Sequence, residues 1–69
     1  MNNASTLPNL VDVVLQGGPT RIERFQSVDD HSVSYGKIKI PFGAGYEHFE
    51  RVSGDDLVFA WTMRTKIAE

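Results

Sequence analysis

The chain has 69 residues, no cysteine, two histidines and a net charge of −2, which leaves room for one domain without disulfides or a Cys/His zinc site. A slightly acidic chain lacks the basic surplus of a sequence-independent nucleic-acid binder, and no apolar run reaches the roughly 18–20 residues of a membrane-spanning helix. We therefore expect no cofactor, no metal and no membrane segment, and we do not expect nucleic acid as a partner.

The N-terminal residues 1–9 are small and polar, and they are predicted to form a flexible terminus before a single β domain over residues 10–69. They have neither the charged nor the apolar region of a signal peptide. Together with the absence of cysteine, this favours a cytoplasmic location. The apolar, β-branched run from Leu10 to Gln16 predicts the first strand, which Gly17-Gly18-Pro19 ends.

The next segment, Thr20 to Val28, has two interpretations. Thr20-Arg21-Ile22-Glu23 fits a helix capping box, but the segment is short. We favour a turn followed by a short strand that ends at Val28. The polar residues 29–32 then predict a loop.

A strand is predicted from Val33 to Phe42. Its apolar residues change parity near Gly36, which indicates a bulge or tight bend at that glycine. Lys37 and Lys39 then lie on the outer face, and Pro41 marks the end of the ladder or a sheet edge.

The last predicted hairpin joins a strand over residues 46–52 to a strand over residues 57–63 through a turn at residues 53–56. The second strand has the most regular alternation in the chain, and Phe59 and Trp61 are its expected core anchors. Residues 64–69 are predicted to be a short tail. The fold class is therefore all-β: a small antiparallel sheet of four to five strands, partly rolled or barrel-like, with at most one helical turn near Thr20.

Three polar side chains occupy alternate positions in the first strand of that hairpin. Tyr46, His48 and Glu50 share one face because successive side chains of a strand point to opposite faces. Without a bulge, His48 lies opposite Trp61 and the row faces the core. With a one-residue bulge, Phe49 lies beside Phe59 and Trp61, and the row faces solvent. The bulged register is favoured, because burying an uncompensated charge costs several kcal/mol.

The candidate ligand-binding residues are Tyr46, His48, Glu50, Trp61 and Arg64. His48 has the chemistry of a general base, with Glu50 as the partner that orients it. A surface histidine beside a surface glutamate is the simpler interpretation. No serine has a convincing base partner, so no catalytic residue is assigned.

Two blocks, Gly45-Tyr46-Glu47-His48-Phe49-Glu50 and Trp61-Thr62-Met63-Arg64-Thr65-Lys66-Ile67-Ala68-Glu69, resemble a family of very short actinobacterial proteins of unknown function. Val13-Val14-Leu15-Gln16-Gly17-Gly18-Pro19 is similar to the opening strand and turn of that family. The resemblance implies an accessory role in specialised-metabolite biosynthesis. It implies no reaction and no catalytic residue.

Small size, exposed strand edges and many aromatic residues favour a protein that acts by binding another protein. We expect self-association as a homodimer, because a sheet of this size has few ways to cover its faces and edges alone, and we also expect a second, unidentified protein partner. The alternative is a small-molecule binder or minimal enzyme that uses the polar row in an aromatic-lined cleft.

Overall fold

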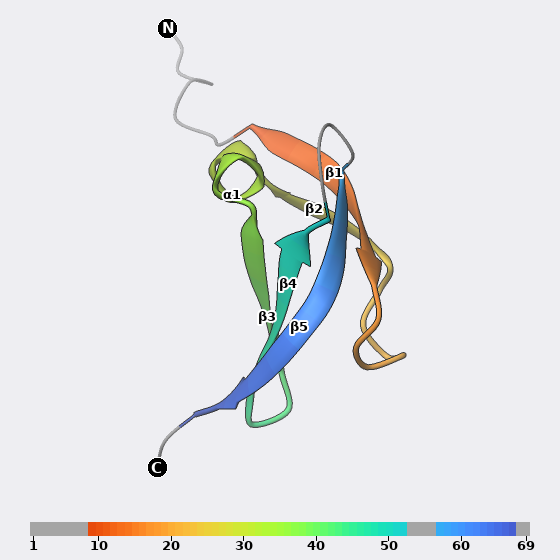
Figure 1. The fold of residues 1–69 in the computed structure, drawn as a ribbon, viewed down its shortest axis with the longest axis vertical. Coiled ribbons are helices and arrows are strands. Elements are labelled where there is room, and N and C mark those ends of the chain that lie inside the picture. The colour runs from red at the N-terminus through yellow and green to blue at the C-terminus, as the bar shows by residue number, and fades with distance from the viewer. Residues whose placement is uncertain (1–8, 53–56, 68–69) are drawn as a thin grey trace, which may run out of the picture.

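The computed structural model describes residues 9–52 and 57–67, and within them the chain forms five strands and one helix. The strands pair into one sheet in the order β2-β1-β5-β4-β3 (Figure 1). The elements in chain order are β1 (Leu10–Gln16), β2 (Phe25–Asp29), α1 (Asp30–Tyr35), β3 (Lys37–Phe42), β4 (Gly45–Arg51) and β5 (Val58–Lys66).

The sheet is mixed, not antiparallel throughout as the sequence suggested. β1 pairs with β5 in parallel, with Leu15 opposite Phe59, whereas the other three neighbouring pairs are antiparallel. A strand from the start of the chain therefore joins the β3–β4–β5 meander at its far side. The five strands fall within the predicted four to five, but the sheet is not closed into a barrel, and β2 and β3 are its two edges.

The helix lies where a loop and the start of a strand were predicted. Asp30–Tyr35 forms α1, and Gly36 ends it as a left-handed C-cap with φ +84°. The parity change at Gly36 therefore marks a helix end, where the left-handed backbone favours glycine, and not a bulge. The capping-box motif that begins at Thr20 forms a turn and no helix. α1 lies beside both edge strands, at the end of the sheet where β3 begins (Figure 1).

The core lies on one face of the sheet. Phe49 and Phe59 are fully buried at its centre, and the buried residues around them are Val13, Leu15, Ile22 and Ile38. Phe59 is thus the predicted core anchor. Trp61 is not, because its side chain is 38% exposed. A bulge in β5 and the neighbouring turn place the indole at the margin of the core.

The turn after β1 packs closely against that indole through its glycines. Gly18 has φ +76°, and a Cβ added there would lie 2.7 Å from Cδ1 of Trp61. Only glycine combines this backbone conformation with such a close approach. The predicted stop at Gly17-Gly18-Pro19 is therefore also a contact surface for Trp61.

Three predicted features fall at the limits of the described residues. Of the N-terminal segment only Asn9 is described, and its carbonyl accepts a hydrogen bond from the Asp30 N–H at 3.0 Å. The predicted turn at residues 53–56 lies outside the described residues. The predicted tail is partly wrong, because β5 continues to Lys66. No helix in the described part of the chain is long and apolar enough to span a membrane.

Candidate binding groove and buried glutamate

The register of β4 on β5 decides where the predicted polar row points. A bulge at His48/Phe49 pairs Phe49 with Trp61 and His48 with Met63. The favoured prediction, the bulged register, is therefore confirmed, and the alternative without a bulge is wrong. Thr62 is the extra residue that has no partner across the ladder.

The bulge divides the five candidate residues between the two faces of the sheet. Tyr46, His48 and Glu50 share the outer face, because the alternating residues Glu47 and Phe49 are buried on the other. Trp61 and Arg64 lie on the core side, where both contact Glu47. The grouping of His48 and Glu50 beside Trp61, which the unbulged alternative required, is therefore not formed, and the row has no aromatic wall from that indole.

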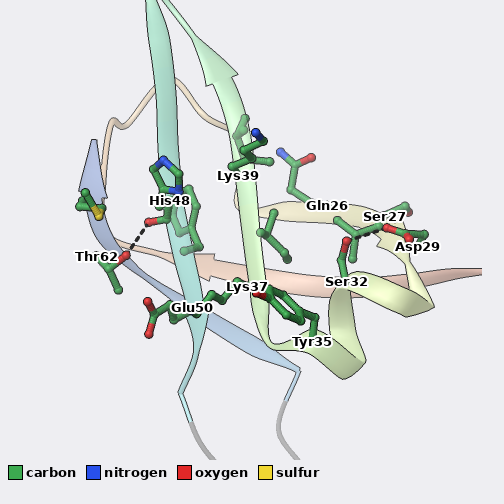
Figure 2. Close-up of a pocket in the computed structure, with 15 residues that line it drawn as sticks. Gln26, Ser27, Asp29, Ser32, Tyr35, Lys37, Lys39, His48, Glu50 and Thr62 are labelled. Carbon is green, nitrogen blue, oxygen red and sulfur yellow. Dashed lines mark hydrogen bonds between the residues drawn. The ribbon is translucent and has the colours of Figure 1, made fainter. Parts of the chain in front are cut away.

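The hydrogen-bond partner of His48 is Thr65 and not Glu50. His48 Nε2 lies 2.7 Å from Thr65 Oγ1, and the His48 carbonyl accepts a hydrogen bond from Thr62 Oγ1 at 3.3 Å (Figure 2). Both contacts come from β5. Thr65 therefore orients the imidazole, and a His48–Glu50 base pair of the kind used in general base catalysis is not formed.

A groove of about 730 Å³ runs along β3 (Figure 2). One wall comes from β2 and α1, the middle from β3, and the other wall from β4 and β5. The polar residues that line it are Gln26, Ser27, Asp29, Ser32, Tyr35, Lys37, Lys39, His48, Glu50 and Thr62. His48 and Glu50 are thus the two predicted site residues that reach this groove. The contribution of β2 and α1 was missed, since no sequence pattern places residues 26–32 beside β3.

The lysines of the groove are held on the outer face by β3. In the ladder Lys37 lies opposite Glu50, and Lys39 lies opposite His48. The ammonium of Lys39 sits 4.6 Å from the ring centre of Tyr46, a cation–π distance. Tyr46 therefore supports the position of Lys39 beside the groove.

The buried carboxylate of Glu47 is the main polar feature that sequence reasoning missed. Its side chain is 1% exposed, and its two oxygens accept hydrogen bonds from Trp61 Nε1 at 2.7 Å and Arg64 Nε at 2.5 Å. Strand alternation places Glu47 on the same face as Phe49, and the bulged register turns that face to the core, so the sequence did contain a signal for its burial. A smaller hollow of about 290 Å³ lies beside this pair.

The electrostatics of Glu47 combine opposing effects. Burial by itself raises the pKa of the carboxyl group. The hydrogen bonds from Trp61 and Arg64, and the charges of Arg64 and His48, together outweigh burial and hold the pKa below the ordinary value of 4.5. Glu47 is therefore a carboxylate that the fold keeps ionised. No cluster of three His, Cys, Asp or Glu side chains suited to a metal ion occurs in the described residues.

We expect Glu47 to make the stability of the protein depend on pH. Its pKa in the folded state is lowered, so its contribution is present above the ordinary pKa and is lost as the pH falls through the folded-state pKa. In urea unfolding, Glu47→Gln is expected to be less stable than the wild type near pH 7, and the gap is expected to shrink towards about pH 3. A gap that is constant or grows in acid would contradict this assignment.

Glu50 gives the contrasting result on the same strand. Its side chain is exposed and lies opposite Lys37 and Ala60. Glu50→Ala is expected to change the free energy of unfolding by under about 0.5 kcal/mol, the usual range for a surface substitution. Thermal melting followed by circular dichroism measures this, and global unfolding of the variant would show that Glu50 is a structural residue.

The fold and the groove define a small mixed-sheet protein in which β2 and β3 are the edge strands of the described sheet. The chain belongs to a family of unknown function, DUF5988, whose model matches residues 7–69. No curated protein and no solved structure matches it.

Proposed function

We propose that this chain is a small accessory protein that binds a partner protein along the open β3 edge and associates with a second copy of itself. The observation that carries the proposal is the groove of about 730 Å³ beside an edge strand. Edge strands present unpaired N–H and C=O groups, which are ready to pair with another chain. Peptide recognition by strand addition uses such an edge together with neighbouring side-chain pockets.

Self-association is supported by an apolar row on the outer face of the sheet. Val14 lies opposite Phe25 on one side and Val58 on the other, and the N–H of Val52 donates to the Val58 carbonyl. The four side chains therefore form one row across β2, β1, β5 and the end of β4. Phe25 is 78% exposed. If the row packed against the same row of a second copy, these apolar side chains would be removed from water.

Sedimentation equilibrium at micromolar concentration tests self-association. We expect a species of twice the 7.7 kDa chain mass for the wild type and a return to the single-chain mass for Phe25→Ser. The matched control is Tyr35→Ser, which removes an exposed aromatic ring from α1 instead of the row. A wild type that sediments at 7.7 kDa would refute the homodimer.

Site-specific photo-crosslinking in the native cell tests partner binding. A photoreactive amino acid replaces Tyr35, an exposed aromatic residue that lines the groove, in one variant and Thr20, which is exposed in the turn after β1, in the other. We expect discrete protein adducts from position 35 and none of these from position 20. Identical adduct patterns from the two positions, or none from either, would count against a partner at β3.

The accessory role in specialised-metabolite biosynthesis rests on the resemblance to short actinobacterial proteins and is part of the proposal. A cytoplasmic location is also part of it, on the ground that the chain has no cysteine.

Small-molecule binding is the second candidate, because the groove volume lies within the roughly 300–1,000 Å³ typical of ligand pockets. His48 and Glu50 are the candidate polar contacts. A fragment screen by NMR tests this: saturable shifts at these two residues, lost in His48→Ala, would favour the small-molecule function over the protein partner.

A further inference from the structure

The pairing of β3 with β4 determines which backbone groups of β3 point away from β4, to the edge of the sheet. The Gly36 carbonyl accepts a hydrogen bond from the Arg51 N–H at 2.9 Å, so these two residues form a hydrogen-bonded pair of the antiparallel ladder. Such pairs alternate along two antiparallel strands, and the register makes Ile38 and Ile40 the next residues that bond to β4. The N–H and C=O groups of the residues between them therefore point to the open edge.

These outward groups belong to Lys37 and Lys39, and each lysine offers one donor and one acceptor. Pro41 offers only its carbonyl, because proline has no N–H. A strand added at this edge can therefore accept hydrogen bonds from two N–H groups of β3, those of Lys37 and Lys39, and the pairing ends near Pro41. An edge of this length fits a short extended segment of about six residues, a common strand length.

The side chains on either face of β3 specify what such a segment carries. Lys37 and Lys39 are exposed on the outer face, so the residues of an added strand on that face lie beside two positive charges. On the other face the neighbours are Ile38, which is buried, and Ile40 and Val28, which are half-buried. Opposite charges across paired strands stabilise, and apolar side chains gain by covering this face.

A second copy of β3 is a poor occupant of this edge. In an antiparallel pair of two β3 strands centred on Ile38, Lys37 of one copy lies opposite Lys39 of the other. Like charges directly opposite each other destabilise a strand pair. The edge is therefore closed to self-pairing by its own lysines and remains open to a strand of opposite charge.

We propose that β3 binds an extended peptide segment with alternating acidic and apolar residues, which adds to the sheet as a sixth strand in the groove. This inference rests on the proposed protein-binding function and names the chemistry of the partner. The acidic residues lie beside the lysines, the apolar residues lie on the Ile38 face, and the peptide backbone pairs with Lys37 and Lys39.

Fluorescence anisotropy at about 0.15 M salt tests the peptide chemistry. The probe is a labelled heptapeptide of alternating valine and glutamate, with a valine–lysine peptide and an N-methylated acidic peptide as controls. We expect the acidic peptide to bind roughly tenfold more tightly than either control, because one control reverses the charge and the other removes backbone donors. Equal binding of the three peptides, or tighter binding of a single-stranded oligonucleotide, would overturn the inference.

Variants of the protein test the site. Lys39→Glu is expected to weaken binding of the acidic peptide roughly tenfold. The matched control Lys66→Glu makes the same charge change on an exposed lysine of β5, outside the groove, and is expected to bind like the wild type. Lys39→Pro removes the outward N–H and is also expected to weaken binding. A Lys66→Glu loss as large as that of Lys39→Glu would show non-specific charge attraction and refute the site.

Protein amide spectra keep these tests independent of folding. Each variant is compared with the wild type by its NMR amide spectrum, and binding is expected to slow hydrogen exchange at Lys37 and Lys39. If the peptides fail to bind while crosslinking at position 35 yields adducts, the acidic strand is refuted and the protein-binding function stands. If both fail, both proposals are refuted.

Discussion

Phe59→Ala is expected to unfold most of the protein under conditions in which the wild type is folded. The ring is fully buried on β5, the strand between β1 and β4, and belongs to the same core cluster as Phe49 and Leu15. Truncating a buried phenylalanine costs about 3–5 kcal/mol, and a domain this small has a free energy of unfolding of only about 5 kcal/mol. Urea titration followed by circular dichroism measures the loss.

Two variants make this expectation specific. Phe25→Ala removes the same atoms from a ring that is 78% exposed, and at concentrations that keep the chain monomeric it is expected to stay within about 0.5 kcal/mol of the wild type. Trp61→Ala is expected to fall between the two, because its indole is partly exposed and donates to Glu47. If Phe59→Ala melted like Phe25→Ala, the core would not lie where the structure places it.

Gly45→Ala is expected to disrupt the pairing of β4 with β5. Gly45 is buried opposite Lys66, and a Cβ added there would lie 2.1 Å from the Thr65 carbonyl oxygen and 3.0 Å from Lys66 Cα. Both contacts are with backbone, so no side chain can move away and the strands must separate. Overpacking a well-packed site costs about 1–3 kcal/mol, and sometimes more; we expect a loss at or above the top of this range.

Gly43→Ala is the matched control in the same hairpin. Gly43 has φ +59°, and an added Cβ meets nothing within 4 Å. Its substitution therefore carries only the left-handed backbone cost of about 1–2 kcal/mol. Thermal melting measures the stability of both variants, and so compares the steric clash of Gly45→Ala with the backbone strain of Gly43→Ala. If Gly43→Ala were the more damaging of the two, the close approach of β5 to Gly45 would be disproved.

Much of the strand pattern was predictable from the sequence. β1 coincides with the predicted strand from Leu10 to Gln16, and β2 ends at Asp29, one residue beyond the prediction. These strands were recognisable because β-branched and alternating residues, followed by glycine or polar turns, are local signals. The bulge that turns His48 and Glu50 away from the core was also favoured, since burying their charges would be costly.

The helix was missed because its signals were weak. α1 is six residues long and has no buried residue, so it shows little of the apolar periodicity that predicts a helix. Its polar start has the composition of a loop. The left-handed Gly36 produced the same change of parity as a bulge, and the sequence pattern alone does not separate the two.

The sequence by itself determined the approximate positions of β1, β2 and β4 and the shared face of Tyr46, His48 and Glu50, because strand alternation and turn residues act over a few neighbours. The tertiary structure alone decided the parallel pairing of β1 with β5, the groove between β2, α1 and β3, and the partners of Glu47. The parallel pairing and the contacts of Glu47 join residues 14 to 44 positions apart along the chain. Such contacts form only when the whole chain packs, and the local alternation of side chains does not indicate which distant strand becomes the neighbour.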